Sequence, residues 1–159
     1  MIKYIKGLNQ TNLVGAEIGV FKGTHAISIL ENLPIKKLFL VDPYLPYFED
    51  GVLVNPISAR KVALQLLRNF GHFVTWVDDV NLPNDLDFVY IDGNHDYKFV
   101  KKDLNLYYDK VREKGVLGGH DFSNQFPGVI KAVSEFAVTR DLNLFIEQPD
   151  WWVVKRVEK

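Results

Sequence analysis

Apolar residues along the chain form short runs that alternate with stretches of helical periodicity. Runs of strand length occupy five places, at 13–20, 38–41, 74–77, 86–91 and 115–119. Between the first two runs, over 26–33, apolar residues recur at intervals of three and four, as is typical of an amphipathic helix. Buried strands that alternate with helices indicate an α/β fold, in which helices cover a parallel sheet.

Local signals predict where the helices begin and end. The first helix follows Gly23 and ends at Pro34, and Ser58 is expected to cap the second helix. The apolar face of this second helix is expected to consist of Ala59, Val62, Ala63, Leu66, Leu67 and Phe70. Further helices are expected over 100–111 and from Pro127, a residue that suits the first helical position.

The end of the chain shows a different pattern. The apolar runs 142–147 and 151–157 are separated only by a short turn around Pro149. They must be antiparallel, because a parallel crossover needs about a dozen residues or more. The complete pattern predicts seven strands, mostly parallel with one reversed. Since no repeat or change in composition marks a boundary, residues 1–159 are expected to form a single minimal domain without a separate lid or substrate domain.

Composition narrows the classes of partner. The 19 Lys and Arg residues nearly balance the 20 Asp and Glu residues, so the net charge of −1 favours neither nucleic acid nor an anionic membrane as partner. The absence of cysteine excludes disulfides, thiolate metal sites and a cysteine nucleophile. No apolar run approaches the ~20 residues of a membrane span, and the N-terminus lacks the apolar centre of a signal peptide. We therefore expect a cytoplasmic protein that acts on a small molecule.

The end of the first strand carries the first candidate binding motif. Glu17, Gly19 and Gly23 form the pattern E-x-G-x-x-x-G, whereas a dinucleotide site would show G-x-G-x-x-G. Glycines allow a ligand to approach the backbone closely. A carboxylate would repel pyrophosphate, but it suits a ligand with an ammonium and a sulfonium group, such as S-adenosylmethionine (SAM). Alternatively, Glu17 is structural and pairs with Lys22 or a backbone amide.

Acidic residues also end the next two strands. Asp42 lies 23 residues after Gly19, where a carboxylate can accept both hydroxyls of a ribose, although Asp42 and Pro43 could simply begin a turn. Asp78 follows the third strand and could reach an adenine amino group. Either Asp78 or Asp79 could equally be a solvated loop residue.

A second constellation follows the fourth and fifth strands. Asp92 and Asp121 end neighbouring strands, so both carboxylates are expected to converge and to suit Mg²⁺ or another divalent ion. His120 could add a nitrogen ligand, which shifts the preference towards Mn²⁺, Fe²⁺ or Zn²⁺. His95 lies three residues after Asp92 and suits general-base catalysis near neutral pH. Alternatively, the histidines cap turns and the aspartates accept backbone N–H groups.

Four segments together resemble the class I SAM-dependent methyltransferases. They are AEIGVFKGTHA, LVDPY, DFVYIDGNHDY and GVLGGHDF, within a similarity that covers about residues 13 to 157. The chain is most similar to the small, often metal-dependent O-methyltransferases related to macrolide-sugar and catechol enzymes. The resemblance implies a Rossmann-like three-layer sandwich with strand order 3-2-1-4-5-7-6 and an antiparallel strand 7.

The resemblance also implies roles for individual residues. It assigns Glu17, Gly19 and Gly23 to the methionine portion of SAM and Asp42 to the ribose, and we count Asp78 and Asp92 among the cofactor-binding residues.

The same relatives imply the chemistry of the second constellation. The metal ligands fall on Asp92, His120 and Asp121, and the general base on His95. Because His120 stands where the relatives carry a carboxylate or its neighbour, the resemblance leaves open whether a metal, Mg²⁺ or Mn²⁺, is needed. The expected reaction is O-methylation of a sugar or another small hydroxylated molecule.

Two other functions remain open. A doubly wound sheet could serve an NAD-dependent oxidoreductase, against which Glu17 argues. The chain could also be a non-catalytic SAM-fold module that binds a partner through the aromatic residues Tyr44, Tyr47, Phe48, Trp151 and Trp152. For the two tryptophans, packing in the core and against the sheet is the more ordinary explanation. For an enzyme, the loops 43–57 and 122–127, or a neighbouring subunit of a homo-oligomer, are expected to complete the acceptor pocket.

Overall fold

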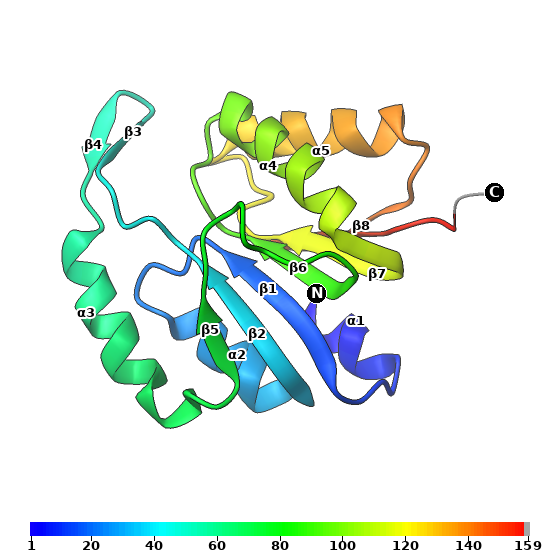
Figure 1. Cartoon of the computed structure of the whole chain (residues 1–159). Helices are drawn as coiled ribbons and strands as arrows, with labels where there is room; N and C mark the ends of the chain where they lie inside the picture. The colour runs from blue at the N-terminus through cyan, green and yellow to red at the C-terminus, as the bar shows by residue number, and fades with distance from the viewer. Residues whose placement is uncertain (158–159) are drawn as a thin grey trace. The chain divides into compact units, whose positions relative to one another are not determined.

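The computed structural model describes residues 1–157, which fall into two compact units. One unit comprises Ile2–Leu82, and the other comprises Met1 and the chain from Pro83 onward. Figure 1 labels the helices and strands of both units. The fold of each unit is described separately.

The Ile2–Leu82 unit contains three parallel strands in the order β5-β2-β1, together with a separate two-stranded sheet. Its elements are α1 (Ile2–Gly7), β1 (Leu13–Ile18), α2 (Thr24–Asn32), β2 (Ile35–Val41), β3 (Tyr47–Glu49), β4 (Val52–Val54), α3 (Ile57–Leu66), the 3-10 helix η1 (Leu67–Phe70) and β5 (Val74–Trp76). Most residues of β1 are buried, as expected for a parallel strand that is covered on both faces.

Helix α3 differs from its prediction in two respects. Its N-cap position is Pro56 and the helix begins at Ile57, so the prediction that Ser58 caps it is wrong. The buried side of α3 is narrower than its apolar pattern suggested, because Val62 and Leu66 are each 40% exposed. The buried residues are the two small alanines, Ala59 and Ala63, and the first residue of η1, Leu67.

Residues 43–57 do not form the irregular loop that the sequence pattern predicts. They include the antiparallel hairpin β3–β4, whose turn consists of Asp50 and Gly51, with φ angles of 47° and 76°. Positive φ at both positions is the geometry of a type I′ turn, for which Asp-Gly is a preferred sequence. The cross-strand pair Phe48 and Leu53 remains largely exposed on this hairpin.

The second unit contains four strands in the order β6-β7-β9-β8. Its elements are β6 (Leu86–Ile91), α4 (Tyr97–Lys110), β7 (Val111–Gly119), α5 (Pro127–Thr139), β8 (Leu144–Glu147) and β9 (Asp150–Val154). Strand β7 runs parallel to β6, and β9 is antiparallel to both β7 and β8. Helices α4 and α5 pack side by side, and α4 covers β6 and β7 (Figure 1).

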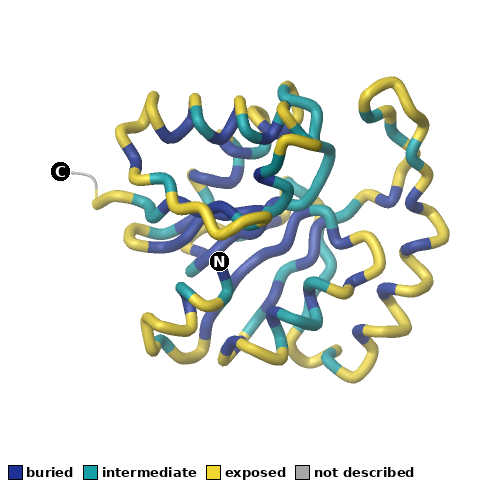
Figure 2. The backbone as a smooth tube through the Cα atoms, turned by 180° about the vertical axis from the view of Figure 1, so that it is seen from behind, coloured by how far each residue is buried: buried dark blue, intermediate teal, exposed yellow. Residues whose placement is uncertain are grey.

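These elements confirm the predicted fold class of seven main strands, mostly parallel with one reversed, and flanking helices. Within each unit the strand order is the predicted one, 3-2-1 and then 4-5-7-6. The pattern did not predict α1 or the β3–β4 hairpin. Strands β1 and β2 of one unit and β6, β7 and β9 of the other are largely buried, whereas the outward faces of the helices are exposed (Figure 2). None of the helices in the described residues has the length and apolar character that crossing a membrane requires.

Trp151 and Trp152 belong to the core of the second unit, with exposed fractions of 1% and 8%. A β-carbon at Gly119 would overlap the carbonyl oxygen of Ile91 and lie 2.8 Å from the Trp151 ring, so only glycine leaves room for this ring. The suggestion of an exposed aromatic surface is therefore wrong for both tryptophans, and the alternative of core packing is confirmed for them. The suggestion is also wrong for Tyr44, which is 5% exposed.

Candidate functional site

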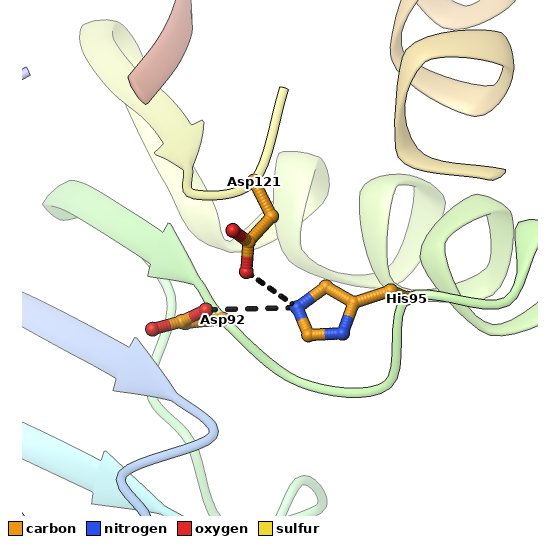
Figure 3. A group of neighbouring side chains, drawn as sticks. All are labelled: Asp92, His95 and Asp121. Atoms are coloured by element: carbon orange, nitrogen blue, oxygen red, sulfur yellow. Dashed lines mark ion pairs between the residues drawn. The ribbon is translucent and has the colours of Figure 1, made fainter. Parts of the chain in front are cut away.

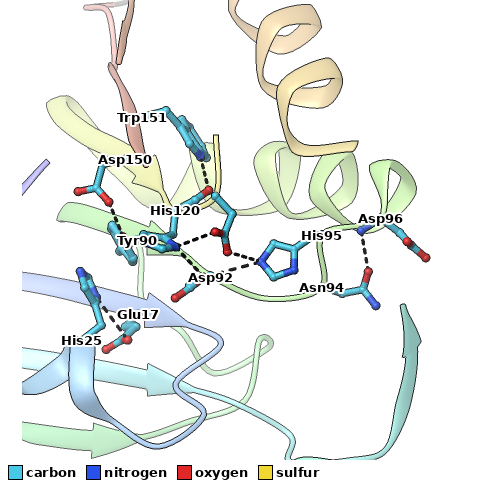
Figure 4. A network of polar contacts seen from close by, with 11 residues as sticks. Glu17, His25, Tyr90, Asp92, Asn94, His95, Asp96, His120, Asp150 and Trp151 are labelled. Atoms are coloured by element: carbon cyan, nitrogen blue, oxygen red, sulfur yellow. Dashed lines mark hydrogen bonds and ion pairs between the residues drawn. The ribbon is translucent and has the colours of Figure 1, made fainter. Parts of the chain in front are cut away.

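The first candidate site begins at the carboxyl end of β1. Glu17 is fully buried there, and it is the one charged residue in the core of the described chain. Its Oε1 lies 3.4 Å from Nδ1 of His25, in the first turn of α2 (Figure 4). The expected alternative partner, Lys22, instead lies over the ring of Phe21. Burial of a carboxylate is costly unless polar groups surround it, so the buried position of Glu17 makes it a candidate for a role beyond packing.

Left-handed backbone shapes the turn between β1 and α2. Gly19 and Gly23 have φ angles of 84° and 81°, which glycine adopts without strain. Gly23 is the N-cap of α2, and its backbone N–H donates to the carbonyl of Val20. A β-carbon at Gly23 would lie 3.1 Å from Leu67, so the turn also packs closely against η1. Both predicted glycines thus hold the backbone beside Glu17.

Asp42 connects this turn to the loop after β2. Its Oδ2 accepts the backbone N–H of Phe21 at 2.8 Å, and its Oδ1 accepts that of Tyr44 at 2.7 Å. The Tyr44 hydroxyl donates back to the Phe21 carbonyl at 2.9 Å. Burial, assisted by the negative charges of Asp42 and Glu17, raises the pKa of Tyr44 well above its usual value, so its hydroxyl remains a donor. Asp42 therefore organises the turn and still has acceptor capacity, because a carboxylate offers about four acceptor positions.

A cavity of about 510 Å³ opens beside Asp42, within the range of small-molecule sites. It is lined by Asp42, Pro43, Tyr44, Arg60, Leu64, Trp76, Val77, Asp78 and Asn81. Asp78 lies in this wall and accepts hydrogen bonds from the backbone and side-chain amides of Asn81 at 2.9 and 2.8 Å. Neither Trp76 nor Arg60 was predicted as a site residue, although the position of Trp76 at the end of β5 was a signal for it.

The second candidate site lies in the other unit, at the ends of β6 and β7. Nε2 of His95 lies 2.8 Å from Oδ2 of Asp121 and 3.9 Å from Oδ1 of Asp92 (Figure 3). Nδ1 of His120 lies 3.1 Å from Oδ1 of Asp121 and 4.0 Å from Oδ1 of Asp92. The structure therefore brings all four residues of the predicted second constellation together.

Local packing holds these side chains in place. The ring of His95 lies against that of Phe126, with centroids 4.3 Å apart. The backbone carbonyl of His120 accepts the indole N–H of Trp151 at 3.2 Å (Figure 4). Asp121 has a φ angle of 60°, a left-handed conformation that aspartate tolerates better than most residues.

The second site has the donor set of a divalent-metal site. One ligand atom from each of Asp92, His95 and Asp121 lies within 4.8 Å of the others. The mixture of carboxylate oxygen and imidazole nitrogen fits Mn²⁺, Fe²⁺ or Zn²⁺ better than an all-oxygen shell does. His95 occupies the place in this cluster that the sequence analysis gave to His120 as ligand. The roles of base for His95 and of ligand for His120 both remain predictions.

Comparison with known proteins places the chain in a family. A family model described as a methyltransferase domain matches residues 16–122. An uncharacterized protein of Acanthamoeba polyphaga mimivirus is 28% identical over 130 residues, which cover 78% of this chain and 59% of that protein. The chain thus spans about three fifths of the length of this relative.

Solved structures with the same fold include several methyltransferases. The O-methyltransferase NovP superposes with a TM-score of 0.66 at 21% identity, over 98% of this chain and 76% of NovP. An O-methyltransferase from Bacillus cereus in complex with SAH gives a TM-score of 0.67 at 14% identity, over 97% and 80% of the two chains. A methyltransferase from Pyrococcus furiosus gives 0.66 at 12% identity, over 98% and 82%. These likenesses establish the fold, and the family match, which covers more than half of the residues, shows that the chain belongs to the methyltransferase-domain family.

Proposed function

We propose that this chain is a SAM-dependent methyltransferase that transfers a methyl group to a hydroxyl oxygen of a small molecule. The observation that carries the proposal is the fully buried Glu17 at the end of β1, beside a turn that Asp42 ties to β2. Membership in the methyltransferase-domain family supports the reaction class. The O-methyltransferases of the same fold, one of them in complex with SAH, support the choice of cofactor and of an oxygen acceptor.

The residues of the Ile2–Leu82 unit fit SAM. Its sulfonium would supply the electrophilic methyl group. Glu17 would offset the positive charge of the methionine portion, where a phosphate-bearing ligand would be repelled. Asp42 would accept the ribose hydroxyls with its remaining acceptor positions. Trp76 and Leu64 provide apolar surface for adenine, and Asp78 provides an acceptor for its amino group.

His95 is our candidate for the general base. We propose that the imidazole proton is carried on Nε2, which lies 2.8 Å from Oδ2 of Asp121, because a carboxylate can only accept a hydrogen bond. The other ring nitrogen, Nδ1, then has a lone pair and points away from both aspartates (Figure 3). It would take the proton of the acceptor hydroxyl, and Asp121 would stabilise the imidazolium that forms.

Asp92, Asp121 and His120 would hold a divalent ion, which would supply Lewis acidity that lowers the pKa of a nearby hydroxyl. In that arrangement the carboxylates serve as ligands and also fix the orientation of the imidazoles. His95 belongs to the same cluster. Without the ion, Nε2 of His95 would keep its contact with Asp121 as its main interaction. The contact of Asp92 with the cofactor, expected from the sequence, remains a prediction.

The acceptor is proposed to be a sugar or another polyhydroxylated small molecule. Its recognition by residues 43–57, by residues 122–127 or by a neighbouring subunit of a homo-oligomer remains a prediction. The β3–β4 hairpin carries apolar side chains that are available for contacts, because Phe48 and Leu53 are 64% and 58% exposed.

The reaction class is tested by transfer of a labelled methyl group from SAM to a panel of hydroxylated small molecules. The proposal expects label in a stable ether product and release of SAH in equal amount. Label recovered only in amines, or no transfer while SAH binds, would contradict O-methylation. A matched reaction with the His95→Gln variant separates enzymatic transfer from background.

A further inference from the structure

Helices α4 and α5 border a second cavity, of about 250 Å³, which opens to the surface of the unit that begins at Pro83. Its apolar wall includes Ala132 and Phe136 of α5. Its polar wall includes Lys101 and Asn105 of α4, with Glu135 and Arg140 from α5 and the residue that follows it. Neither the family match nor the proposed methyl transfer assigns a function to this cavity.

Arg140 is held at the cavity by aromatic stacking. Its guanidinium carbon lies 4.7 Å from the centroid of the Tyr108 ring and 5.0 Å from that of Phe136. The two rings pack edge to face, which gives the guanidinium a fixed platform. Nη2 donates one hydrogen bond, to the side-chain oxygen of Asn105 at 3.3 Å. Among residues 1–157, no carboxylate forms an ion pair with Arg140.

The other charges of the wall compensate one another. The Tyr97 hydroxyl donates to Oε2 of Glu135 at 2.5 Å, and Nζ of Lys101 lies 3.9 Å from the same oxygen. Lys101 also donates to the Tyr97 hydroxyl at 2.9 Å, and this hydrogen bond raises the pKa of the lysine. Lys101 therefore offsets Glu135, while Arg140 contributes a positive charge without a carboxylate partner in the described chain.

We infer that the cavity binds a small aromatic monocarboxylate. A guanidinium recognises a carboxylate through paired N–H donors, and the stacked position of Arg140 reduces the entropy lost when it binds. The wall of Ala132 and Phe136 suits an apolar body rather than a bare inorganic anion. The volume lies just below the usual ~300 Å³ lower limit of ligand pockets, which limits the occupant to about the size of a single substituted ring.

Benzoate is the probe for this site, and titration calorimetry with NMR of backbone amides is the measurement. We expect saturable binding, with shifts concentrated in α4 and α5. Arg140→Gln should weaken benzoate binding by about tenfold or more, because the charged hydrogen bonds are lost. Arg156→Gln is the matched control, since Arg156 already pairs with Asp141 at 2.7 Å; this variant should bind like the wild type.

Two further comparisons separate charge from shape. Thr139→Phe, at an exposed position of the lining, should block the cavity while Arg140 is retained. Benzyl alcohol lacks the carboxylate of benzoate, and inorganic phosphate lacks its aromatic ring. Both should bind about tenfold more weakly than benzoate or not at all.

The opposite results would overturn the inference. One such result is that the wild type shows no saturable binding of benzoate at tens of millimolar, or that its amide shifts lie outside α4 and α5. Another is that Arg140→Gln or Thr139→Phe binds benzoate as tightly as the wild type does. A third is that benzyl alcohol or phosphate binds the wild type as tightly as benzoate does. Thermal unfolding of each variant establishes that it is folded. If Arg140→Gln does not fold, Thr139→Phe still tests whether benzoate binds in this cavity.

Discussion

Nε2 of His95 lies 2.8 Å from Oδ2 of Asp121, although the two residues belong to loops that follow different strands. The side chains of both residues are 19% exposed, so the pair is accessible to a ligand and partly shielded from water. Partial shielding strengthens the interaction of an imidazolium with a carboxylate. This relationship is the basis of the proposed acid–base chemistry.

Replacement of His95 tests its role as the base. His95→Gln should lower kcat by about 100-fold or more, which is the usual contribution of general-base catalysis. SAH affinity should remain within about twofold of the wild type, because the proposed cofactor residues other than Asp92 lie in the other unit. His72→Gln is the matched control, since His72 is exposed and lies outside both candidate sites. An unchanged kcat of His95→Gln across the pH range would exclude the base.

Metal dependence tests the second role of the same cluster. Chelation should reduce activity, and Mn²⁺ should restore it, because Asp92, Asp121 and His120 offer mixed oxygen and nitrogen ligands. Asp121→Ala should weaken Mn²⁺ binding, measured by calorimetry, by about tenfold or more. Activity that survives both chelation and Asp121→Ala would remove the metal from the mechanism.

Gly119 should be among the positions least tolerant of a larger residue. Gly119→Ala forces a β-carbon against Ile91 and Trp151, and we expect it to lower the free energy of unfolding by about 2 kcal/mol or more. Gly7→Ala is the matched control, because a β-carbon there meets no atom within 4 Å. Urea unfolding measures both variants. A Gly119→Ala variant as stable as Gly7→Ala would show that the described packing around Trp151 is incorrect.

Tyr44 should make the stability of the protein sensitive to alkaline pH. Burial raises the pKa of Tyr44 in the folded state above the ordinary value near ~10, so the folded state holds this proton more tightly than the unfolded state. The resulting stabilisation is complete below pH ~10 and is lost as the pH rises towards the folded-state pKa. Urea unfolding between about pH 8 and pH 11 should show a steeper alkaline loss in the wild type than in Tyr44→Phe. Equal slopes would contradict this assignment.

Much of the fold could be predicted because its signals are local. Strand β6 has the predicted bounds because a run of apolar residues ends abruptly at Asp92. The β3–β4 hairpin was missed because three-residue strands contain too little alternation to detect, although Asp50 and Gly51 signalled the turn. The exposed side of α3 was missed because periodicity shows which residues share a face, but not how much of that face is covered.

The candidate sites were predictable to a similar extent. Residues at strand ends, such as Asp42 and Asp121, were found because parallel strands bring their carboxyl ends to a common edge. The contact of Glu17 with His25 was not predicted, since it depends on the left-handed turn between them. The stacked position of Arg140 was missed for the same kind of reason, because it requires two helices to meet at a particular angle.

Calorimetry with SAH measures whether the Ile2–Leu82 unit holds SAM through Glu17 and Asp42. The wild type should bind one SAH per chain, and Asp42→Ala should weaken binding by about tenfold or more as the ribose hydrogen bonds are lost. Asp141→Asn, at a residue whose side chain is 89% exposed, should bind like the wild type. Absence of SAH and SAM binding to the folded wild type at millimolar concentration, or equal affinity of Asp42→Ala, would contradict the account.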